Sequence, residues 1–340
     1  MKHIIWHGLY ETFRFPKEEL GCLSHILPSY YLLQQLEYIG FNISYLPEMS
    51  ASMEYAALLC YDLPYDGIST PVLNLRLLKR RALIIIRQLK ENRYVSWKKL
   101  TSTLPAKCIK ILYLFESKAI SPWQYLPENH NQFDIVFTYD RHLLRTSSKY
   151  RLQLIPNTKP SIELKIKPFS EKNFACMINS NKSSAISGQL YSERRAAARA
   201  FEKFSTSKFS LYGQGWQQFV SSRGAIEDKL LVLTNYRFSL CYENFVCSGY
   251  ITEKIFDCFY AKIVPVYLGA PDILEWIPQQ AFIDRRNFQS NKELIDFLVQ
   301  LSPDCYQLYL SAAHRFITSV KFNPFSQENF SSQLISALNQ

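Results

Sequence analysis

Short apolar runs alternate with segments of helical periodicity along most of this chain. Runs such as "HIIWHGLY" (3–10), "CIKILYLFES" (108–117) and "FACMINSN" (174–181) have the length and apolar content of buried strands. A segment such as "YSERRAAARAFEKFS" (191–205) has the spacing of a helix. Strands that alternate with helices favour parallel sheets with helices on both faces. At 340 residues the chain has room for two such α/β domains, each a doubly wound, Rossmann-like sheet.

A polar stretch with two prolines, "NTKPSIELKIKPFSEKN" (157–173), interrupts this alternation. We expect an N-terminal domain over 1–160, a C-terminal domain over 170–320 and a C-terminal tail or helix over 321–340. Ligands of doubly wound sheets bind outside the carboxyl ends of the strands. Polar side chains at those strand ends are therefore the candidates for a functional site.

Positive charge is concentrated in one segment. Residues 76–110 contain eleven lysines and arginines and one acidic residue, a surplus equal to the net charge of +10 of the whole chain. We expect a helix over about 72–91 inside it. Such a basic segment is typical of a solvated helix face, of a contact with an anionic membrane or of a nucleic-acid footprint. No nucleic-acid motif accompanies the charge, so we expect no nucleic-acid partner.

Cysteine spacing and apolar runs bear on the cellular location. The eight cysteines are scattered without a Cys-x-x-Cys pair, which indicates reduced thiols rather than disulfides or a metal site. No apolar run approaches the ~20 residues that span a bilayer, and the N-terminus has the pattern of a first strand rather than of a signal peptide. The sequence therefore predicts a cytoplasmic protein, with segment 76–110 as the place for a peripheral contact at the inner face of the membrane.

One stretch combines polar chemistry with buried elements, "CYENFVCSGYITEKIFDCFYAKIVPVYLGAP" (241–271). Glu243 and Asn244 follow a short apolar run that has the character of a central strand. Thr252 is a good N-cap for a helix running to about Ala261. A purely structural turn does not require the carboxylate, amide, phenol and ammonium groups that this stretch contains.

Two pairs of charges are unusual for helix starts. Lys254 lies in a first turn, where the helix dipole disfavours a cation. A docked anion such as a diphosphate would account for it, and a solvated surface lysine is the alternative. Arg194 and Arg195 lie in an early turn as well, where arginine suits bidentate phosphate contacts, although Glu193 could simply pair with one of them.

Glu116 lies where the strand run "ILYLFE" meets a loop. A carboxylate at a strand end beside apolar residues can serve as a general base, although many strand ends carry a glutamate. The sequence has no P-loop, no Gly-x-Gly-x-x-Gly and no Asp-x-Asp pair for a nucleotide-bound metal. Cationic side chains would therefore neutralise a phosphate-bearing leaving group, and we expect no metal site.

The stretch "FSLCYENFVCSGYITEKIFDCFYAKIVPVYLGAPDILEWIPQQAFIDRRNF" (238–288) resembles the signature of the α1,3/α1,4-fucosyltransferases, glycosyltransferase family 10. Its Tyr-Glu-Asn, Tyr-Ile-Thr-Glu-Lys, Val-Pro-Val and Gly-Ala-Pro elements occur in the family's order and spacing. The resemblance extends more weakly to "LYSERRAAARAFEKF" and to "LYLFESKAISP". It implies a GT-B fold, with two Rossmann-like domains facing each other across a cleft: the domain over 1–160 would bind the acceptor and the domain over 170–320 would bind GDP-fucose.

The resemblance also implies roles for individual residues. Glu116 would be the general base that takes the proton of the acceptor hydroxyl. Lys254, together with Arg194 or Arg195, would hold the phosphates of GDP-fucose. The remaining donor-site residues would line the sugar and nucleotide: Asn244, Tyr250 and Glu253.

Lys262 stands where many family members have glycine, at a helix end where we expect no consequence. We find no counterpart of the membrane anchor of animal members or of the heptad repeats of some bacterial ones. These departures favour a soluble or peripherally bound microbial enzyme.

The sequence thus predicts an inverting fucosyltransferase that moves L-fucose from GDP-fucose to a hydroxyl, O3 or O4 of N-acetylglucosamine, of a surface glycan such as a lipopolysaccharide. The acceptor could be lipid-linked. GDP-fucose is a co-substrate and no cofactor is required, with stimulation by a divalent cation as the most that is expected. Two alternatives remain: a transferase for a different GDP-sugar, and a basic peripheral membrane or nucleic-acid-binding protein with an inactive transferase core.

Overall fold

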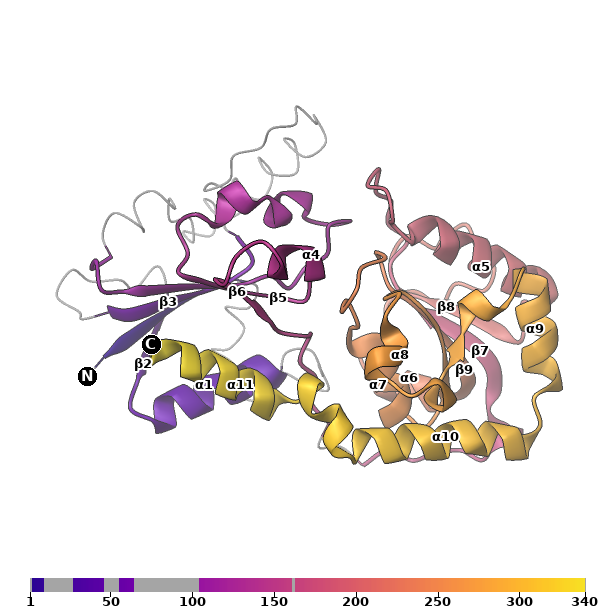
Figure 1. Cartoon of the computed structure of the whole chain (residues 1–340). Coiled ribbons are helices and arrows are strands. Elements are labelled where there is room, and N and C mark those ends of the chain that lie inside the picture. The colour runs from indigo at the N-terminus through magenta and orange to yellow at the C-terminus, as the bar shows by residue number, and fades with distance from the viewer. Residues whose placement is uncertain (1, 9–26, 46–54, 64–103, 161–162, 340) are drawn as a thin grey trace. The chain divides into compact units, whose positions relative to one another are not determined.

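The computed structural model describes residues 2–8, 27–45, 55–63, 104–160 and 163–339 (Figure 1). Within these ranges the chain forms two compact units, with the change of unit between Gln153 and Leu154. The last residues, from Glu328 onward, belong to the first unit. The expected helix over 72–91 and most of the basic segment 76–110 lie outside the described residues.

The first unit is built on a parallel sheet with the strand order β2-β1-β3-β4-β5-β6. The inner strand Tyr55–Tyr61, "YAALLCY", is a continuous and almost fully buried apolar run, as expected for a sheet that is covered on both faces. The strands are β1 (His3–Gly8), β2 (Asn42–Tyr45), β3 (Tyr55–Tyr61), β4 (Ile109–Tyr113), β5 (Ile135–Thr138) and β6 (Tyr150–Leu152). The described helices are α1 (Leu27–Tyr38), the 3₁₀ helices η5 (Pro122–Tyr125) and η6 (Pro127–His130), α4 (Arg141–Leu144) and α11 (Gln327–Leu338).

Helix α11 completes the core of the first unit although it comes last in the sequence. The ring of Phe330, which is fully buried, lies 6.2 Å from that of Tyr61 in β3 and 5.4 Å from that of Tyr113 in β4. Burying one such side chain contributes roughly 1.5–3 kcal/mol. The C-terminal helix is therefore part of the first unit's hydrophobic core rather than an appended tail.

The second unit is built on another parallel sheet, with the order β11-β10-β9-β7-β8. Its strands are β7 (Asn173–Ile178), β8 (Phe209–Tyr212), β9 (Tyr236–Tyr242), β10 (Val264–Leu268) and β11 (Ile283–Asp284). The α-helices are α5 (Tyr191–Phe204), α6 (Lys229–Leu233), α7 (Glu253–Tyr260), α8 (Ile273–Trp276), α9 (Asn291–Gln300) and α10 (Pro303–Ile317). Its 3₁₀ helices are η7 (Phe169–Glu171), η8 (Gln279–Ala281), η9 (Arg285–Asn287) and η10 (Val320–Phe325). Both sheets confirm the predicted α/β class with parallel strands.

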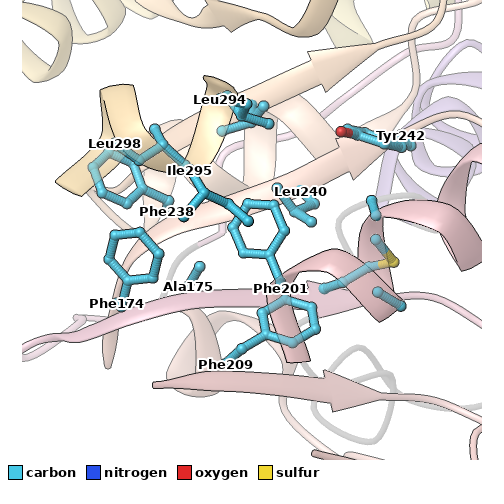
Figure 2. Packing of buried hydrophobic residues seen from close by; sticks show 14 of the residues in the cluster. Phe174, Ala175, Phe201, Phe209, Phe238, Leu240, Tyr242, Leu294, Ile295 and Leu298 are labelled. Carbon is cyan, nitrogen blue, oxygen red and sulfur yellow. The ribbon is translucent and has the colours of Figure 1, made fainter. Parts of the chain in front are cut away.

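The two faces of the central strand β9 carry different neighbours. Phe238 and Leu240 lie on the face covered by α5 and α9, where Figure 2 shows them packed with Phe201 and Ile295. Cys241 points to the other face, where its sulfur lies 3.2 Å from that of Cys258 in α7. Strand β9 is therefore buried on both sides, and its carboxyl end projects from a rigid layer.

Helix α7 buries Phe256 against the rings of Phe322 and Phe325. Its C-terminus ends in a Schellman motif: the N–H of Ile263 donates to the carbonyl of Cys258, and the N–H of Lys262 donates to that of Phe259. Lys262 has a φ of 51°, in the left-handed region that favours glycine. The replacement of the family's glycine thus has a consequence for the backbone that the sequence analysis did not expect.

Candidate active site

Glu243 is the organising carboxylate at the carboxyl end of β9. It is fully buried, and its Oε1 accepts from the Thr252 N–H at 2.9 Å, while its two oxygens accept from the Thr252 hydroxyl at 3.0 and 2.9 Å. Thr252 occupies the predicted N-cap position of α7, but its hydroxyl makes no cap hydrogen bond to the helix. Glu243 lies nine residues before Thr252, at the end of β9, and its hydrogen bonds to Thr252 anchor the start of α7.

Lys254 lies in the first turn of α7 and faces this carboxylate. Its Nζ is 3.2 Å from Glu243 Oε2, 3.4 Å from Glu253 Oε1 and 2.9 Å from the Thr252 hydroxyl. Burial opposes the charge of Lys254, but the carboxylates of Glu243 and Glu253 outweigh it and raise the pKa above its usual value. The unfavourable lysine predicted from the sequence is thus stabilised as a cation by two carboxylates.

Glu253 links this group to a second ion pair. Lys229 in α6 lies 2.7 Å from the buried Asp257 and 3.6 Å from Glu253. Burial disfavours the Lys229 cation, yet Asp257 and Glu253 raise its pKa. Glu253 therefore lies between two lysines, at the edge of a network that couples α6, α7 and the end of β9.

The structure separates the two candidate arginines. Arg194 is buried, and its Nε and Nη2 donate to the carbonyl of Tyr242, the last residue of β9, at 3.1 and 2.7 Å. Burial lowers the pKa of Arg194, and the charge of Glu243 opposes that shift. Arg195 points elsewhere and donates from Nη1 to the carbonyl of Lys182 at 2.8 Å. Arg194 is the arginine that joins the cluster around Glu243.

Asn244 and Tyr250 flank this cluster on the loop between β9 and α7. Both are buried. The carbonyl of Asn244 accepts from the N–H of Leu190 at 2.9 Å, which ties the loop to the start of α5. The carbonyl of Tyr250 accepts from the Tyr267 hydroxyl at 3.4 Å. The structure therefore brings Arg194, Asn244, Tyr250, Glu253 and Lys254 together around the end of β9.

Gly269 makes room for this arrangement. A Cβ atom there would lie 2.5 Å from Cγ of Glu243 and 2.5 Å from the hydroxyl oxygen of Tyr267, closer than side chains approach. The glycine of the Gly-Ala-Pro element is thus required by the close approach of Glu243.

Glu116 belongs to the first unit, in the loop after β4. Its N–H donates to both carboxylate oxygens of Asp62 at 3.3 Å, and its carbonyl accepts from the hydroxyls of Tyr125 at 2.6 Å and Tyr139 at 3.3 Å. The Tyr125 and Tyr139 hydroxyls also hydrogen-bond to each other. The backbone around the predicted base is thus held from both sides.

Sequence reasoning assigned no role to Glu243, Asp62 or Lys229. The position of Glu243 directly after a buried strand was a signal, but its partners become visible only when the loop returns at Thr252. The described residues contain no group of three or more His, Cys, Asp and Glu side chains that could hold a metal ion. None of the helices in the described ranges is long and apolar enough to cross a membrane.

Comparison with known proteins agrees with this architecture. A crystal structure of an α1,3-fucosyltransferase with GDP-fucose superposes with a TM-score of 0.56 at 16% identity, over 99% of this chain and 90% of that one. An α-glucosyltransferase in complex with UDP-glucose and abasic DNA superposes with a TM-score of 0.58 at 11% identity, over the full length of both chains. The fold is that of a GT-B glycosyltransferase.

Residues 170–334 match the family model "Glycosyltransferase family 10 (fucosyltransferase) C-term". This match confirms the resemblance to glycosyltransferase family 10 seen in the sequence.

Curated relatives match over shorter stretches. The α-(1,3)-fucosyltransferase FucT of Helicobacter pylori is 33% identical over 76 residues, which is 22% of this chain and 16% of that protein. The α-(1,3)-fucosyltransferase C of Drosophila melanogaster is 36% identical over 78 residues, 22% and 18% of the two chains. The GDP-fucose protein O-fucosyltransferase 3 of Danio rerio is 37% identical over 99 residues, 28% and 21% of the two chains. The matched stretch thus spans about a fifth or less of each relative.

Proposed function

We propose that this protein is an inverting fucosyltransferase that moves L-fucose from GDP-fucose to O3 or O4 of N-acetylglucosamine in a surface glycan such as a lipopolysaccharide. The observation that carries the proposal is the pair of cations, Arg194 and Lys254, at the carboxyl end of β9 within the family 10 region. Carboxyl ends of strands are where doubly wound sheets bind nucleotides. Relatives named as α1,3-fucosyltransferases favour the α1,3 linkage.

In this proposal the reaction is a single displacement at the anomeric carbon of fucose. Glu116 takes the proton of the acceptor hydroxyl while that oxygen forms a bond to the carbon. The bond from the carbon to the phosphate oxygen breaks, and its electron pair leaves with GDP. Attack opposite the leaving group inverts the anomeric configuration, and Arg194 and Lys254 stabilise the charge that develops on the diphosphate.

The cluster suits that role because groups of the protein itself hold its cations in place. Lys254 is fixed by Glu243 and Glu253, and Arg194 by the carbonyl of Tyr242. Charges that are already oriented need no reorganisation as the leaving group forms. In the bound complex, Asn244 and Tyr250 would line the donor, and Glu253 would face its fucose or ribose hydroxyls.

We further propose that the reaction needs no metal cofactor and is at most stimulated by a divalent cation. The enzyme would act in the cytoplasm, with segment 76–110 as a peripheral contact with an anionic membrane that presents a lipid-linked acceptor.

A second candidate keeps the donor and changes the acceptor. Relatives named GDP-fucose protein O-fucosyltransferase 3, from Danio rerio and from several mammals, match stretches of similar length. They favour a serine or threonine hydroxyl of a protein in place of a glycan hydroxyl. The donor-site residues would have the same roles in either case.

The test is release of GDP from GDP-fucose, with GDP-mannose and UDP-galactose as control donors. N-acetyllactosamine, lacto-N-biose and serine- or threonine-containing peptides are offered as acceptors, with and without EDTA. We expect acceptor-dependent release from GDP-fucose that is lost in Glu116→Gln and Lys254→Ala. Release with peptides alone would favour the second candidate, and release from GDP-mannose a different GDP-sugar. If no guanine nucleotide binds, the transferase proposal fails and the basic segment becomes the place to look for function.

A further inference from the structure

Asp62 lies at the carboxyl end of β3, beside the strand that leads to Glu116. Tyr61 and Tyr113 are register partners of the neighbouring strands β3 and β4. The Asp62 N–H continues this ladder by donating to the carbonyl of Tyr113 at 2.9 Å. Its buried carboxylate accepts from the N–H of Phe115 at 2.8 Å and from the N–H of Glu116 at 3.3 Å. The carboxylate thus closes the turn that carries Glu116.

The backbone of Asp62 is also unusual. Its φ is 59°, and Lys262 is the other non-glycine residue with a positive φ in the described part of the chain. Aspartate and asparagine tolerate this region better than most residues, and glycine adopts it freely. Glycine would therefore fit this backbone conformation equally well. The conformation does not explain why residue 62 carries a carboxylate.

The charged form of the Asp62 carboxylate is unfavourable in this buried position. Burial and, next to it, the charge of Glu116 raise the pKa of Asp62 to about 7, and the two backbone hydrogen bonds offset only part of this shift. The titratable groups that face it within the described ranges are Glu116 and Tyr113 from the β4 side and its own neighbour Tyr61. A buried acid that repels a nearby acid is typical of functional sites rather than of structural turns.

We propose that Asp62 is the positioning residue of the catalytic base: its carboxylate holds the N–H groups of Phe115 and Glu116, so that the Glu116 side chain leaves the sheet in one fixed direction. Tyr125 and Tyr139 hold the carbonyl of the same residue, so the backbone of Glu116 is fixed on both sides. This inference rests on the proposed function, in which Glu116 is the base.

The test compares Asp62→Asn, Asp62→Gly and the control Asp134→Asn. Asparagine keeps one acceptor oxygen and tolerates the positive φ, but it removes the charge. Glycine adopts the positive φ freely, but it removes the side chain that accepts from the N–H groups of Phe115 and Glu116. Asp134 also accepts a backbone N–H, that of Lys110 at 2.7 Å, but at the opposite end of β4. The kcat and KM for GDP-fucose are measured against pH with N-acetyllactosamine. Hydrogen exchange of the peptide 113–118 is followed in the same proteins.

We expect Asp62→Asn, which keeps an oxygen that can accept from the Phe115 and Glu116 N–H groups, to retain most of the wild-type kcat with an unchanged KM for GDP-fucose. In Asp62→Gly, kcat falls about 100-fold, as for a base displaced by about 1 Å. Exchange of the Phe115 and Glu116 amides accelerates in Asp62→Gly, stays close to wild type in Asp62→Asn, and Asp134→Asn changes none of these values. A wild-type kcat in Asp62→Gly, or an equal loss of kcat in Asp62→Asn and Asp62→Gly, would overturn the inference. If the wild type transfers no fucose, the proposed function fails. Unchanged hydrogen exchange in Asp62→Gly would separately refute the role of Asp62 in holding the N–H groups of Phe115 and Glu116.

Discussion

The carboxylate of Glu243 and the ammonium of Lys254 lie 3.2 Å apart, between the end of β9 and the first turn of α7. The glutamate side chain is fully buried and that of the lysine is 17% exposed. A cation at this end of a helix opposes the helix dipole, so the pairing explains how Lys254 remains charged and directed at the strand end. The proposed donor site would therefore be organised by a residue that need not touch the donor.

The Glu243–Lys254 pair should show strong energetic coupling. In Glu243→Gln we expect the free energy of unfolding to fall by about 3 kcal/mol, because a buried cation loses its main counter-charge. Lys254→Met in the same background should recover at least about 1 kcal/mol of that loss in a double-mutant cycle measured by urea unfolding. The control is the exposed pair of Lys292 and Asp296 at 2.6 Å, for which we expect coupling below about 0.5 kcal/mol. Equal coupling for the two pairs would contradict this prediction.

Arg194 and Arg195 should differ sharply in their effect on donor binding. Lysine at 194 cannot reproduce the two-pronged contact of the guanidinium with the Tyr242 carbonyl. We expect Arg194→Lys to raise the Kd for GDP about 100-fold, whereas Arg195→Lys changes it less than about 3-fold. Isothermal titration with GDP measures both values. A larger effect at 195 would show that the wrong arginine has been assigned to the phosphates.

Lys262→Gly should stabilise the protein. The residue has a φ of 51° at the end of α7, where an L side chain is strained by roughly 1 kcal/mol or more. Its carbonyl still accepts from Nζ of Lys172 at 2.8 Å after the change, since only backbone is involved. Part of the gain is offset by the greater freedom of glycine in the unfolded chain, so we expect an increase of about 0.5–1 kcal/mol in the free energy of unfolding. Lys262→Ala keeps the strain and should give no such increase.

Asp62 should make the stability of the protein depend on pH. Its pKa is about 7 in the folded state and near 4 in an unfolded chain, so the folded protein retains a proton that the unfolded chain has released. Below about pH 4 both states are protonated. As the pH rises from 4 to 7 the free energy of unfolding should fall by a few kcal/mol, and above 7 this contribution is constant. Asp62→Asn lacks this slope, so urea unfolding of both proteins between pH 4.5 and 8 should show the variant gaining on the wild type.

The sheets and the main helices of the second unit could be predicted from the sequence because their signals are local. Buried parallel strands are short apolar runs, and α5 shows its helical spacing directly. The same helical spacing distinguishes Arg194 from Arg195. Arg194 precedes the buried Ala197, Ala198 and Phe201 by three, four and seven residues, so it lies on the buried face of α5.

The roles of Glu243 and Asp62 could not be predicted because their partners are brought together by tertiary structure. Glu243 meets Thr252 and Lys254 only when the loop after β9 returns to the strand end. Asp62 meets Glu116 across 54 residues of sequence, through the parallel register of β3 and β4. A residue-by-residue pattern carries no information on such a register.

The position of α11 reverses the order in which the two units become complete during synthesis. The second unit ends at Gln327, whereas the first still lacks Phe330 and the residues around it when the ribosome reaches that point. The N-terminal strands are synthesised first, but Tyr61 and Tyr113 are covered only after α11 has been synthesised. The C-terminal unit is therefore the first to be complete on the nascent chain, against the usual N-to-C order of domain folding.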